Sequence, residues 1–404
     1  MFSVISPAVY VPLIFILLIV VFAFILWKDA KKISHNSTKG LPYYNEVEMS
    51  VDYISRNTLE NGRFKYRNNV DTDIKYDNDT YNSLRHAGTL YSLYQYEKLG
   101  FENKYHDLRI LSSKYFIERY IKQIDNTKYA VLSIPDEEGM KIPIAKSGAA
   151  GIALCALANL YSENVVDLEI LRGLGEFLLW MQSKEGNIYA YYDFDKKEIN
   201  KEAEAIYYTG EAAAGLIYLY EIDSQQKWLD GAKKALFYLQ RTQNQSNLDS
   251  IFDHWAVFAI EKLTEANLLV SQEYQLLKDY AEKMALPMLT AQITNKNHIY
   301  YGALKDNIRP CSLGTIMEGL ASIYFCTDSE KLKMVIYKSL ALGCMFLSRT
   351  QVKIGENAGG LPNSANWVKP GVSPNAGVIR IDNVQHVITA WLKFQKILKV
   401  RGVY

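Results

Sequence analysis

The chain has 404 residues, 49% of them hydrophobic, and a formal net charge of +1. This length is enough to bury one large core or two ordinary ones. The nearly neutral charge, without a long run of one sign, argues against a nucleic-acid-binding protein, which would carry a basic face. The four cysteines stand apart in apolar stretches without the spacing of metal ligands, so neither a zinc site nor a disulfide framework is predicted.

The N-terminal region contains a long apolar segment. Residues 9–27 (VYVPLIFILLIVVFAFILW) carry no charge and are almost wholly apolar. This segment is long enough to span a bilayer. No small-residue cleavage site follows, so residues 1–32 are expected to form an uncleaved single-pass anchor in the cell (inner) membrane, with a polar linker over 33–45. Three lysines directly after the span favour a cytoplasmic body under the positive-inside rule. Work on an exported polymer would instead place the body outside the cytoplasm, which is the orientation we expect.

Residues 46–404 are expected to form one all-α domain. Apolar residues recur at helical spacing in twelve segments, near 46–59, 80–98, 103–123, 146–162, 166–183, 202–222, 226–242, 252–265, 272–289, 310–327, 329–349 and 381–399. Long links, rich in Gly, Asn and aromatic residues, alternate with short ones, which groups the helices into six hairpins. Because no hairpin can bury its apolar faces alone, six of them predict a closed ring, the (α/α)6 toroid, lined by the second helix of each hairpin.

Polar side chains recur near the start of the second helices. On the last one, Asp382, Gln385, His386 and Thr389 follow at i, i+3, i+4 and i+7 and form a stripe beside the apolar face. The candidate site residues chosen on this basis are Asn82, Arg85, His86, Glu204, Tyr207, Tyr208, Glu211, Asp253, His254, Trp255, Arg309, Glu318, Arg380, Asp382, Gln385 and His386. Each alone has an ordinary explanation as a helix cap, a first-turn acid or a hydrogen-bonded core residue. Their recurrence at matching depth predicts one central polar cleft.

The six-hairpin pattern over residues 46–400 resembles the (α/α)6 carbohydrate-active enzymes. These are the six-hairpin glycosidases, the unsaturated glucuronyl hydrolases and the N-acylglucosamine 2-epimerase superfamily. The resemblance is architectural, and it implies that aromatic and charged residues of the inner helices bind an oligosaccharide or polysaccharide in the central cleft. Thirty tyrosines and six tryptophans suit that role, although most of them are expected to fill the core.

Hydrolysis of a glycosidic bond is the leading expectation for the reaction. It needs a proton donor and a second carboxylate that acts as base or nucleophile. Asp382 and Glu211 are the preferred pair, and packing against aromatic rings would raise the pKa of the donor. Arg85 and His86 would then hold a substrate hydroxyl or carboxylate, and the remaining acids of the cleft are reserves.

Two alternatives stay open. The resemblance to the epimerase superfamily implies two catalytic histidines on the inner helices of the fourth and sixth hairpins, where His254 and His386 stand, and imidazoles exchange protons near neutral pH. The domain could instead be a non-catalytic glycan-binding subunit that works with other proteins of an envelope polysaccharide assembly. No metal, nucleotide or flavin motif is present in the sequence, so no cofactor is predicted.

Overall fold

The structure is a computed structural model that describes residues 39–76, 80–101, 103–243, 252–369 and 371–403. The predicted membrane span at residues 9–27 lies outside these ranges. Among the helices of the described ranges, none combines the length and the apolar character needed to cross a bilayer.

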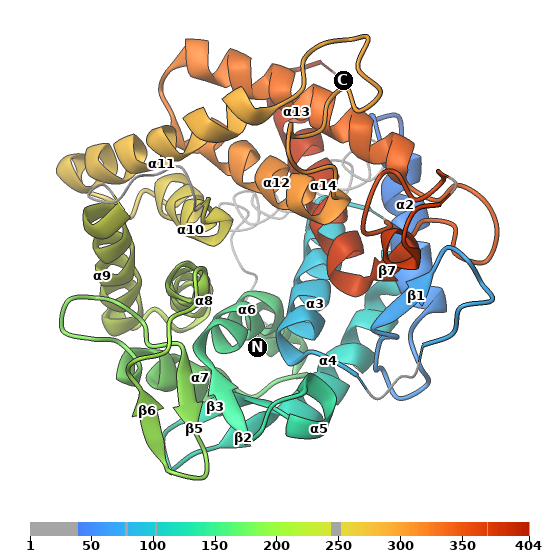
Figure 1. Ribbon diagram of the computed structural model, residues 1–404. Coiled ribbons are helices and arrows are strands. Elements are labelled where there is room, and N and C mark those ends of the chain that lie inside the picture. Colours follow the sequence, from blue (N-terminus) through green and yellow to red (C-terminus); the bar gives the residue numbers. More distant parts are fainter. Residues whose placement is uncertain (1–38, 77–79, 102, 244–251, 370, 404) are drawn as a thin grey trace, which may run out of the picture.

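Twelve long helices of the described residues match the twelve predicted segments and follow one another in six pairs (Figure 1). The first helices of the pairs are α2 (Tyr44–Arg56), α4 (His106–Tyr120), α7 (Leu168–Trp180), α9 (Gln226–Gln243), α11 (Ser271–Ala291) and α13 (Glu330–Thr350). The second helices are α3 (Ser83–Lys98), α6 (Ser147–Leu157), α8 (Tyr208–Asp223), α10 (His254–Glu265), α12 (Pro310–Cys326) and α14 (Ile381–Val400). Short helical segments also occur, namely α5 (Pro135–Glu138) and 3-10 turns at Asn103–Tyr105, Ala158–Glu163 and Pro374–Gly377.

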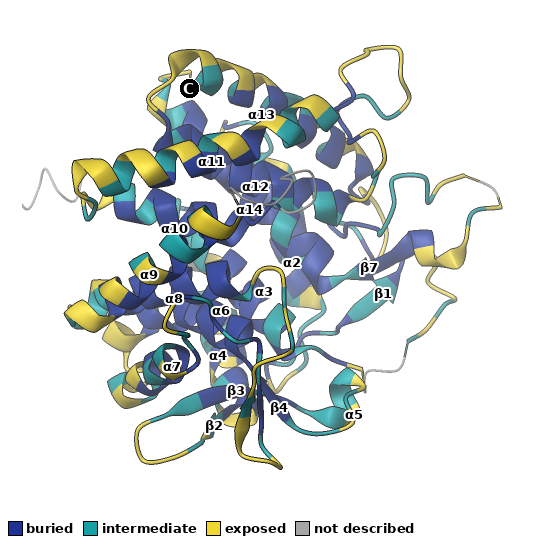
Figure 2. Ribbon diagram, turned by 60° about the vertical axis from the view of Figure 1, so that its left-hand side comes forward, coloured by how far each residue is buried: buried dark blue, intermediate teal, exposed yellow. Residues whose placement is uncertain are grey.

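The second helices form a closed inner ring. Each packs against the next, and α14 packs against α3, while the first helices stand outside them (Figure 1). The inner helices are almost entirely buried, whereas the outer helices α9, α11 and α13 expose one face to solvent (Figure 2). This arrangement is the predicted (α/α)6 toroid, and it explains why a helix such as α6 is apolar or small on every side.

Small residues allow the inner helices to approach each other closely. A side chain at Gly151 of α6 would meet the backbone carbonyl of Glu211 at 2.3 Å, and one at Gly215 of α8 would meet the carbonyl of Gly151 at 2.4 Å. Glycine at these two positions therefore lets α6 and α8 pack backbone against backbone.

The long links inside the pairs contain seven short strands among the described residues, so the domain is nearly all-helical. One antiparallel sheet holds β2 (Ile121–Gln123), β3 (Tyr129–Ser133), β4 (Ile144–Lys146), β5 (Tyr191–Asp193) and β6 (Glu198–Asn200) in that order. A second sheet pairs β1 (Arg67–Asn69) with β7 (Val378–Arg380), and Arg67 lies directly opposite Arg380. This second sheet joins the first hairpin to the last and so closes the ring.

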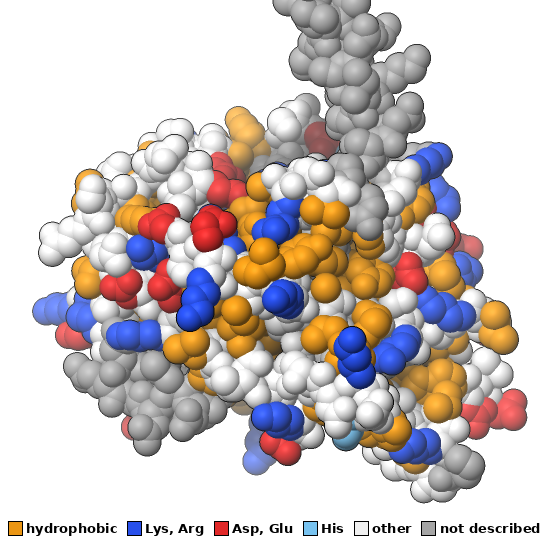
Figure 3. All heavy atoms as spheres, turned by 90° about the horizontal axis from the view of Figure 1, so that it is seen from above, with side chains coloured by type: hydrophobic (Ala, Val, Ile, Leu, Met, Phe, Trp, Pro, Cys, Tyr) orange, Lys and Arg blue, Asp and Glu red, His pale blue; other side chains and the backbone are white. Residues whose placement is uncertain are grey.

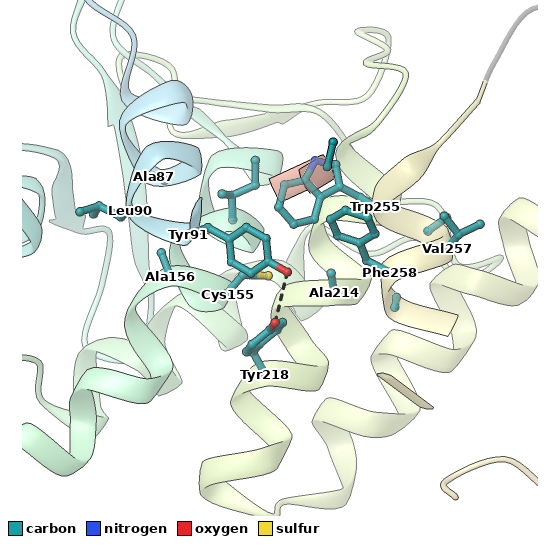
Figure 4. Packing of buried hydrophobic residues seen from close by; sticks show 14 of the residues in the cluster. Ala87, Leu90, Tyr91, Cys155, Ala156, Ala214, Tyr218, Trp255, Val257 and Phe258 are labelled. Carbon is teal, nitrogen blue, oxygen red and sulfur yellow. Dashed lines mark hydrogen bonds between the residues drawn. The ribbon is translucent and has the colours of Figure 1, made fainter. Parts of the chain in front are cut away.

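An aromatic layer fills the centre of the ring (Figure 4). The hydroxyl groups of Tyr91 and Tyr218 lie 3.3 Å apart, and the ring of Tyr91 lies 5.3 Å from that of Trp255. Phe258 packs 5.2 Å from Trp255 in the same layer. Trp255 lines a cavity at one end of the ring, whereas the other three residues line a smaller cavity of about 150 Å³ at the opposite end. The layer therefore separates the two cavities.

The outer helices α11 and α13 carry a separate apolar groove of about 640 Å³. Leu286 and Leu289 of α11 and Leu332 and Val335 of α13 line it. Figure 3 looks onto this side of the ring, where apolar side chains lie among lysines and acidic residues.

Candidate active site

A cavity of about 480 Å³ lies where the inner helices begin. Its volume falls within the range of roughly 300–1,000 Å³ that is typical of small-molecule sites. Eight of the residues predicted from the sequence line it, namely Arg85, Tyr207, Glu211, His254, Trp255, Asp382, Gln385 and His386. The predicted polar cleft therefore exists, and four of the six inner helices, α3, α8, α10 and α14, contribute these eight residues from their first two turns or, for Tyr207, from the cap.

Two histidines face each other in the cavity wall. His254 is the first residue of α10, and His386 lies in the second turn of α14. Their ring centroids lie 5.6 Å apart at an interplanar angle of 75°. Both ring nitrogens of His254 are buried, and neither has a hydrogen-bond partner within the described residues. His386 donates its Nδ1–H to Glu318 Oε1 at 3.2 Å, which leaves Nε2 for a bound molecule.

The surroundings of the two imidazoles favour opposite charge states. Burial, together with the nearby positive charges of His386 and Lys393, lowers the pKa of His254 well below its ordinary value. Burial also acts to lower the pKa of His386, but the negative charges of Glu318 and Asp382 outweigh it and raise the pKa of His386. His254 is therefore a neutral imidazole when His386 still carries its proton. Such a pair can act as a base and an acid at the same pH.

Glu318 stands behind the histidines rather than in the cavity wall. Only 3% of its side chain is exposed, and burial raises its pKa while the contact with His386 opposes that rise. The ligating atoms of His254, Glu318 and His386 all lie within 4.8 Å of one another. Two imidazoles and a carboxylate are a donor set that Zn²⁺ and similar ions accept, so these three side chains could hold a metal that the sequence did not predict.

Asp382 is an ionised carboxylate between two arginines. Its Oδ1 and Oδ2 accept hydrogen bonds from Arg380 Nε and Nη2, each at 2.9 Å, and Arg85 Nε lies 3.1 Å from Oδ2. Burial acts to raise the pKa of Asp382, yet Arg85 and Arg380 together hold it below its ordinary value. Of the predicted pair of carboxylates, Asp382 therefore does not suit the role of proton donor.

Glu211 is the cavity acid that favours its protonated form. Burial and the neighbouring Asp253 raise the pKa of Glu211 well above its ordinary value, and Lys146 opposes this. Its Oε2 is buried without a hydrogen-bond partner among the described residues. Asp253 caps α10 by accepting hydrogen bonds from the backbone N–H groups of Trp255 and Ala256 at 3.0 Å, and burial raises its pKa to about 7. Asp253 therefore acts on the cavity through Glu211 and does not line it.

His86 does not reach the cavity, which corrects the expectation that it holds substrate. It is fully buried between α3 and α4 against the rings of Phe64 and Phe116. Its Nε2–H donates to the carbonyl of Ser112 at 3.0 Å, so its Nδ1 accepts from the hydroxyl of Tyr81 at 2.6 Å. Burial lowers the pKa of His86 to about 3. His86 is a structural residue of the first hairpin.

Other predicted residues also lie outside the cavity wall. Asn82 caps α3: its Oδ1 accepts from the backbone N–H of Arg85 at 3.0 Å, and its Nδ2 donates to Glu138. Glu204 is exposed in the loop before α8, because an Asx turn at Asn200 ends the strand and delays the helix to Tyr208. The predicted start of that helix near residue 202 was therefore wrong.

The last three predicted residues that do not line the cavity, Tyr208, Arg309 and Arg380, are all at helix starts. Tyr208 turns toward Tyr191 of β5, with ring centroids 5.9 Å apart. Arg309 is exposed before α12. Four polar residues of the wall are not among the candidates, namely Asn307, Cys311, Ser312 and Thr315. Their only signal was their position near Arg309 at the start of an inner helix.

Comparisons with known proteins show the fold. No protein-family model matches the sequence, and no curated protein matches it. An inactive variant of the alpha-1,6-mannanase of Salegentibacter sp. HEL1_6, in complex with alpha-1,6-mannotriose, is similar over 87% of this chain and 99% of its own, with 15% identity and a TM-score of 0.58.

Two sugar-converting enzymes are similar in the same way. A D-mannose isomerase is similar over 88% of this chain and 97% of its own chain, with 14% identity and a TM-score of 0.62. The cellobiose 2-epimerase of Bacillus thermoamylovorans B4167 covers 88% of this chain and 98% of its own, with 13% identity and a TM-score of 0.63. These likenesses confirm the predicted (α/α)6 architecture, while a fold of this kind hosts more than one reaction.

Proposed function

We propose that this protein is a sugar isomerase or epimerase that moves a proton at the carbon next to the carbonyl of a reducing sugar. The observation that carries the proposal is the pair of cavity imidazoles, 5.6 Å apart, whose surroundings favour opposite charge states. Proton transfer at carbon needs a base and an acid that are both ready at one pH, and this pair supplies them.

In this proposal each group has one role. Neutral His254 takes the proton from the carbon next to the carbonyl of the open-chain sugar. The electron pair of that C–H bond becomes the double bond of an enediolate, and the carbonyl oxygen becomes an oxyanion that the side-chain amide of Gln385, which also lines the cavity, stabilises. His386 then returns a proton. Delivery to the same carbon from the other face, with collapse of the oxyanion to the carbonyl, gives the epimer. Delivery to the former carbonyl carbon gives the ketose when the proton of the neighbouring hydroxyl passes to the former carbonyl oxygen and that neighbouring C–O becomes the new carbonyl.

Hydrolysis, the leading expectation from the sequence, becomes the second candidate. Glu211 with its raised pKa could donate a proton, which is the observation in its favour. The partner carboxylate Asp382, however, has both oxygens bound by arginines. The inactive mannanase variant named above lacks two consecutive aspartates. This chain has no two consecutive aspartates anywhere in its sequence.

Purified protein incubated with a panel of sugars tests the two candidates. The panel contains mannose, glucose, cellobiose and alpha-1,6-mannotriose, and the products are followed by ¹³C NMR. His254→Asn and His386→Asn should each reduce conversion of a reducing sugar by about 10²–10⁴-fold, the usual contribution of a general acid or base. His298→Asn, in an exposed loop, is the matched control and should leave the rate unchanged. Release of mannose from mannotriose that depends on Glu211 and not on the histidines would favour hydrolysis instead.

We further propose that the predicted membrane span holds the cavity away from the bilayer. Gln395, in the last part of α14, donates to the carbonyl of Pro42 at 2.8 Å, and Tyr43 stacks on Trp391 with ring centroids 6.2 Å apart. The described chain therefore starts at the end of the ring opposite the cavity. Cysteine labelling just after Lys32 from each side of the membrane tests the expected extracytoplasmic orientation.

A further inference from the structure

We propose that Arg85 and Arg380 form an anion-binding subsite, so that the substrate is an acidic sugar whose carboxylate or phosphate they bind. That the acidic sugar is the substrate rests on the proposed function, whereas the preference for binding an acidic sugar can be measured without any reaction.

The two arginines are more exposed than the carboxylate that they share. The side chain of Arg85 is 30% exposed and that of Arg380 is 24% exposed, whereas that of Asp382 is 7% exposed. One carboxylate balances only one of the two positive charges. The cluster therefore presents a net positive charge at the beginning of α14. Arg85 and Asp382 line the cavity, and Arg380 is joined to them through its two hydrogen bonds to Asp382.

Both guanidinium groups keep free donors. A guanidinium carries five N–H groups. Within the described residues, Arg380 uses Nε and one N–H of Nη2 on Asp382. Arg85 uses Nε on Asp382 and one N–H of Nη1 on the hydroxyl of Tyr66. Three N–H groups thus remain on each arginine, and carboxylates and phosphates accept hydrogen bonds from such groups in pairs.

A third arginine strengthens the positive field. Arg67 of β1 lies directly opposite Arg380 of β7, and these two strands lie side by side next to the start of α14 (Figure 1). Like charges directly opposite each other on neighbouring strands destabilise a sheet. Arg67 Nε is buried and has no hydrogen-bond partner among the described residues. An anion beside this pair would relieve the repulsion.

The other acid of the cavity wall does not cancel this charge. Burial and Asp253 keep Glu211 toward its protonated form, so its carboxyl group offers a neutral hydrogen-bonding surface. The wall is therefore positive on the side of Arg85 and close to neutral on the side of Glu211. A sugar with one acidic end fits this asymmetry better than a neutral sugar does.

Calorimetric binding to the full chain tests the proposal with matched probes. Glucuronate is compared with glucose, and mannose 6-phosphate with mannose, at low ionic strength. At least one acidic sugar should bind about tenfold or more tightly than its neutral counterpart, and 0.5 M NaCl should reduce that preference because salt screens exposed charges. A preference in the first pair identifies a carboxylate as the ligand, and one in the second identifies a phosphate.

Two variants complete the test. Arg380→Gln should reduce the preference for the acidic sugar to less than about threefold. Arg172→Gln is the control, since Arg172 is also paired with an aspartate, Asp223, but lies on the outer helix α7. If Arg380→Gln does not fold, Arg380→Lys and the salt dependence of the wild type give the same information.

Equal affinity for acidic and neutral sugars in the wild type, or an equal effect of Arg172→Gln, would overturn the proposal. Failure of all sugars to react would overturn the proposed function and leave the binding result intact.

Discussion

Glu318→Gln removes the negative charge that holds the proton on His386. A hydrogen bond of 3.2 Å joins the two residues, and the side chains of Glu318 and His386 are only 3% and 18% exposed. Solvent therefore screens the pair weakly. At an effective dielectric constant of about 20, two unit charges at this distance attract by about 5 kcal/mol before the cost of burial is subtracted. A hydrogen bond to a charged group contributes about 1.5–3 kcal/mol net, which corresponds to about 1–2 pKa units.

The pKa of His386 should therefore fall by about 1–2 units in Glu318→Gln. Because His386 must be protonated to act as the acid, the alkaline limb of the kcat/KM profile should move to lower pH by the same amount. At a pH above the alkaline limb of both proteins the rate should fall about 10–100-fold, with recovery as the pH is lowered. The assay is kcat/KM against pH together with NMR titration of ¹⁵N-labelled histidine. Glu330→Gln, at an 81% exposed side chain of α13, is the control. An alkaline limb that stays in place would refute the assignment of His386 as the acid.

Three further predictions concern stability and metal binding. Glu261→Gln should destabilise the fold by about 3–5 kcal/mol in urea unfolding, because it leaves the buried Lys393, 2.7 Å away in the wild type, without its partner; a loss below 1 kcal/mol would contradict this. Since the pKa of His86 is about 3 in the fold and 6.5 ordinarily, wild-type stability should fall by up to about 5 kcal/mol as the pH drops from 6.5 to 3. His86→Gln should flatten this dependence, and an unchanged slope would count against it. Zn²⁺ should inhibit the enzyme reversibly by occupying both cavity imidazoles, and His254→Asn should weaken Zn²⁺ binding measured by calorimetry.

The ring could be predicted because its signals are local. Helical spacing of apolar residues marks each helix, and the alternation of long and short links marks each hairpin. The predicted helices therefore match the observed ones closely, except where a turn intervenes. The start of α8 at Tyr208 depends on the side chain of Asn200, which accepts hydrogen bonds from the backbone N–H groups of Glu202 and Ala203. A competing turn of this kind does not change the apolar period, so the sequence pattern could not show it.

The site could be predicted only in part because an inner helix is buried on every side. Arg85 and His86 are neighbours on one polar stripe, yet Arg85 lines the cavity and His86 points into the interface with α4. Successive residues of a helix point about 100° apart, so the spacing alone does not tell which of the two faces the cavity. Only the position of α4 separates their roles. The charge state of Asp382 depends on Arg85, which lies about 300 residues earlier in the chain. A contact at that separation leaves no local pattern.

Solvent exchange at carbon tests the central claim most directly. The protein is incubated in D₂O with the reducing sugar that it binds, and ¹H NMR follows the proton on the carbon next to the carbonyl. If His254 removes that proton, deuterium should enter this position in the wild type, and entry should stop in His254→Asn. A sugar that is converted or cleaved while this position keeps its original proton would contradict the account.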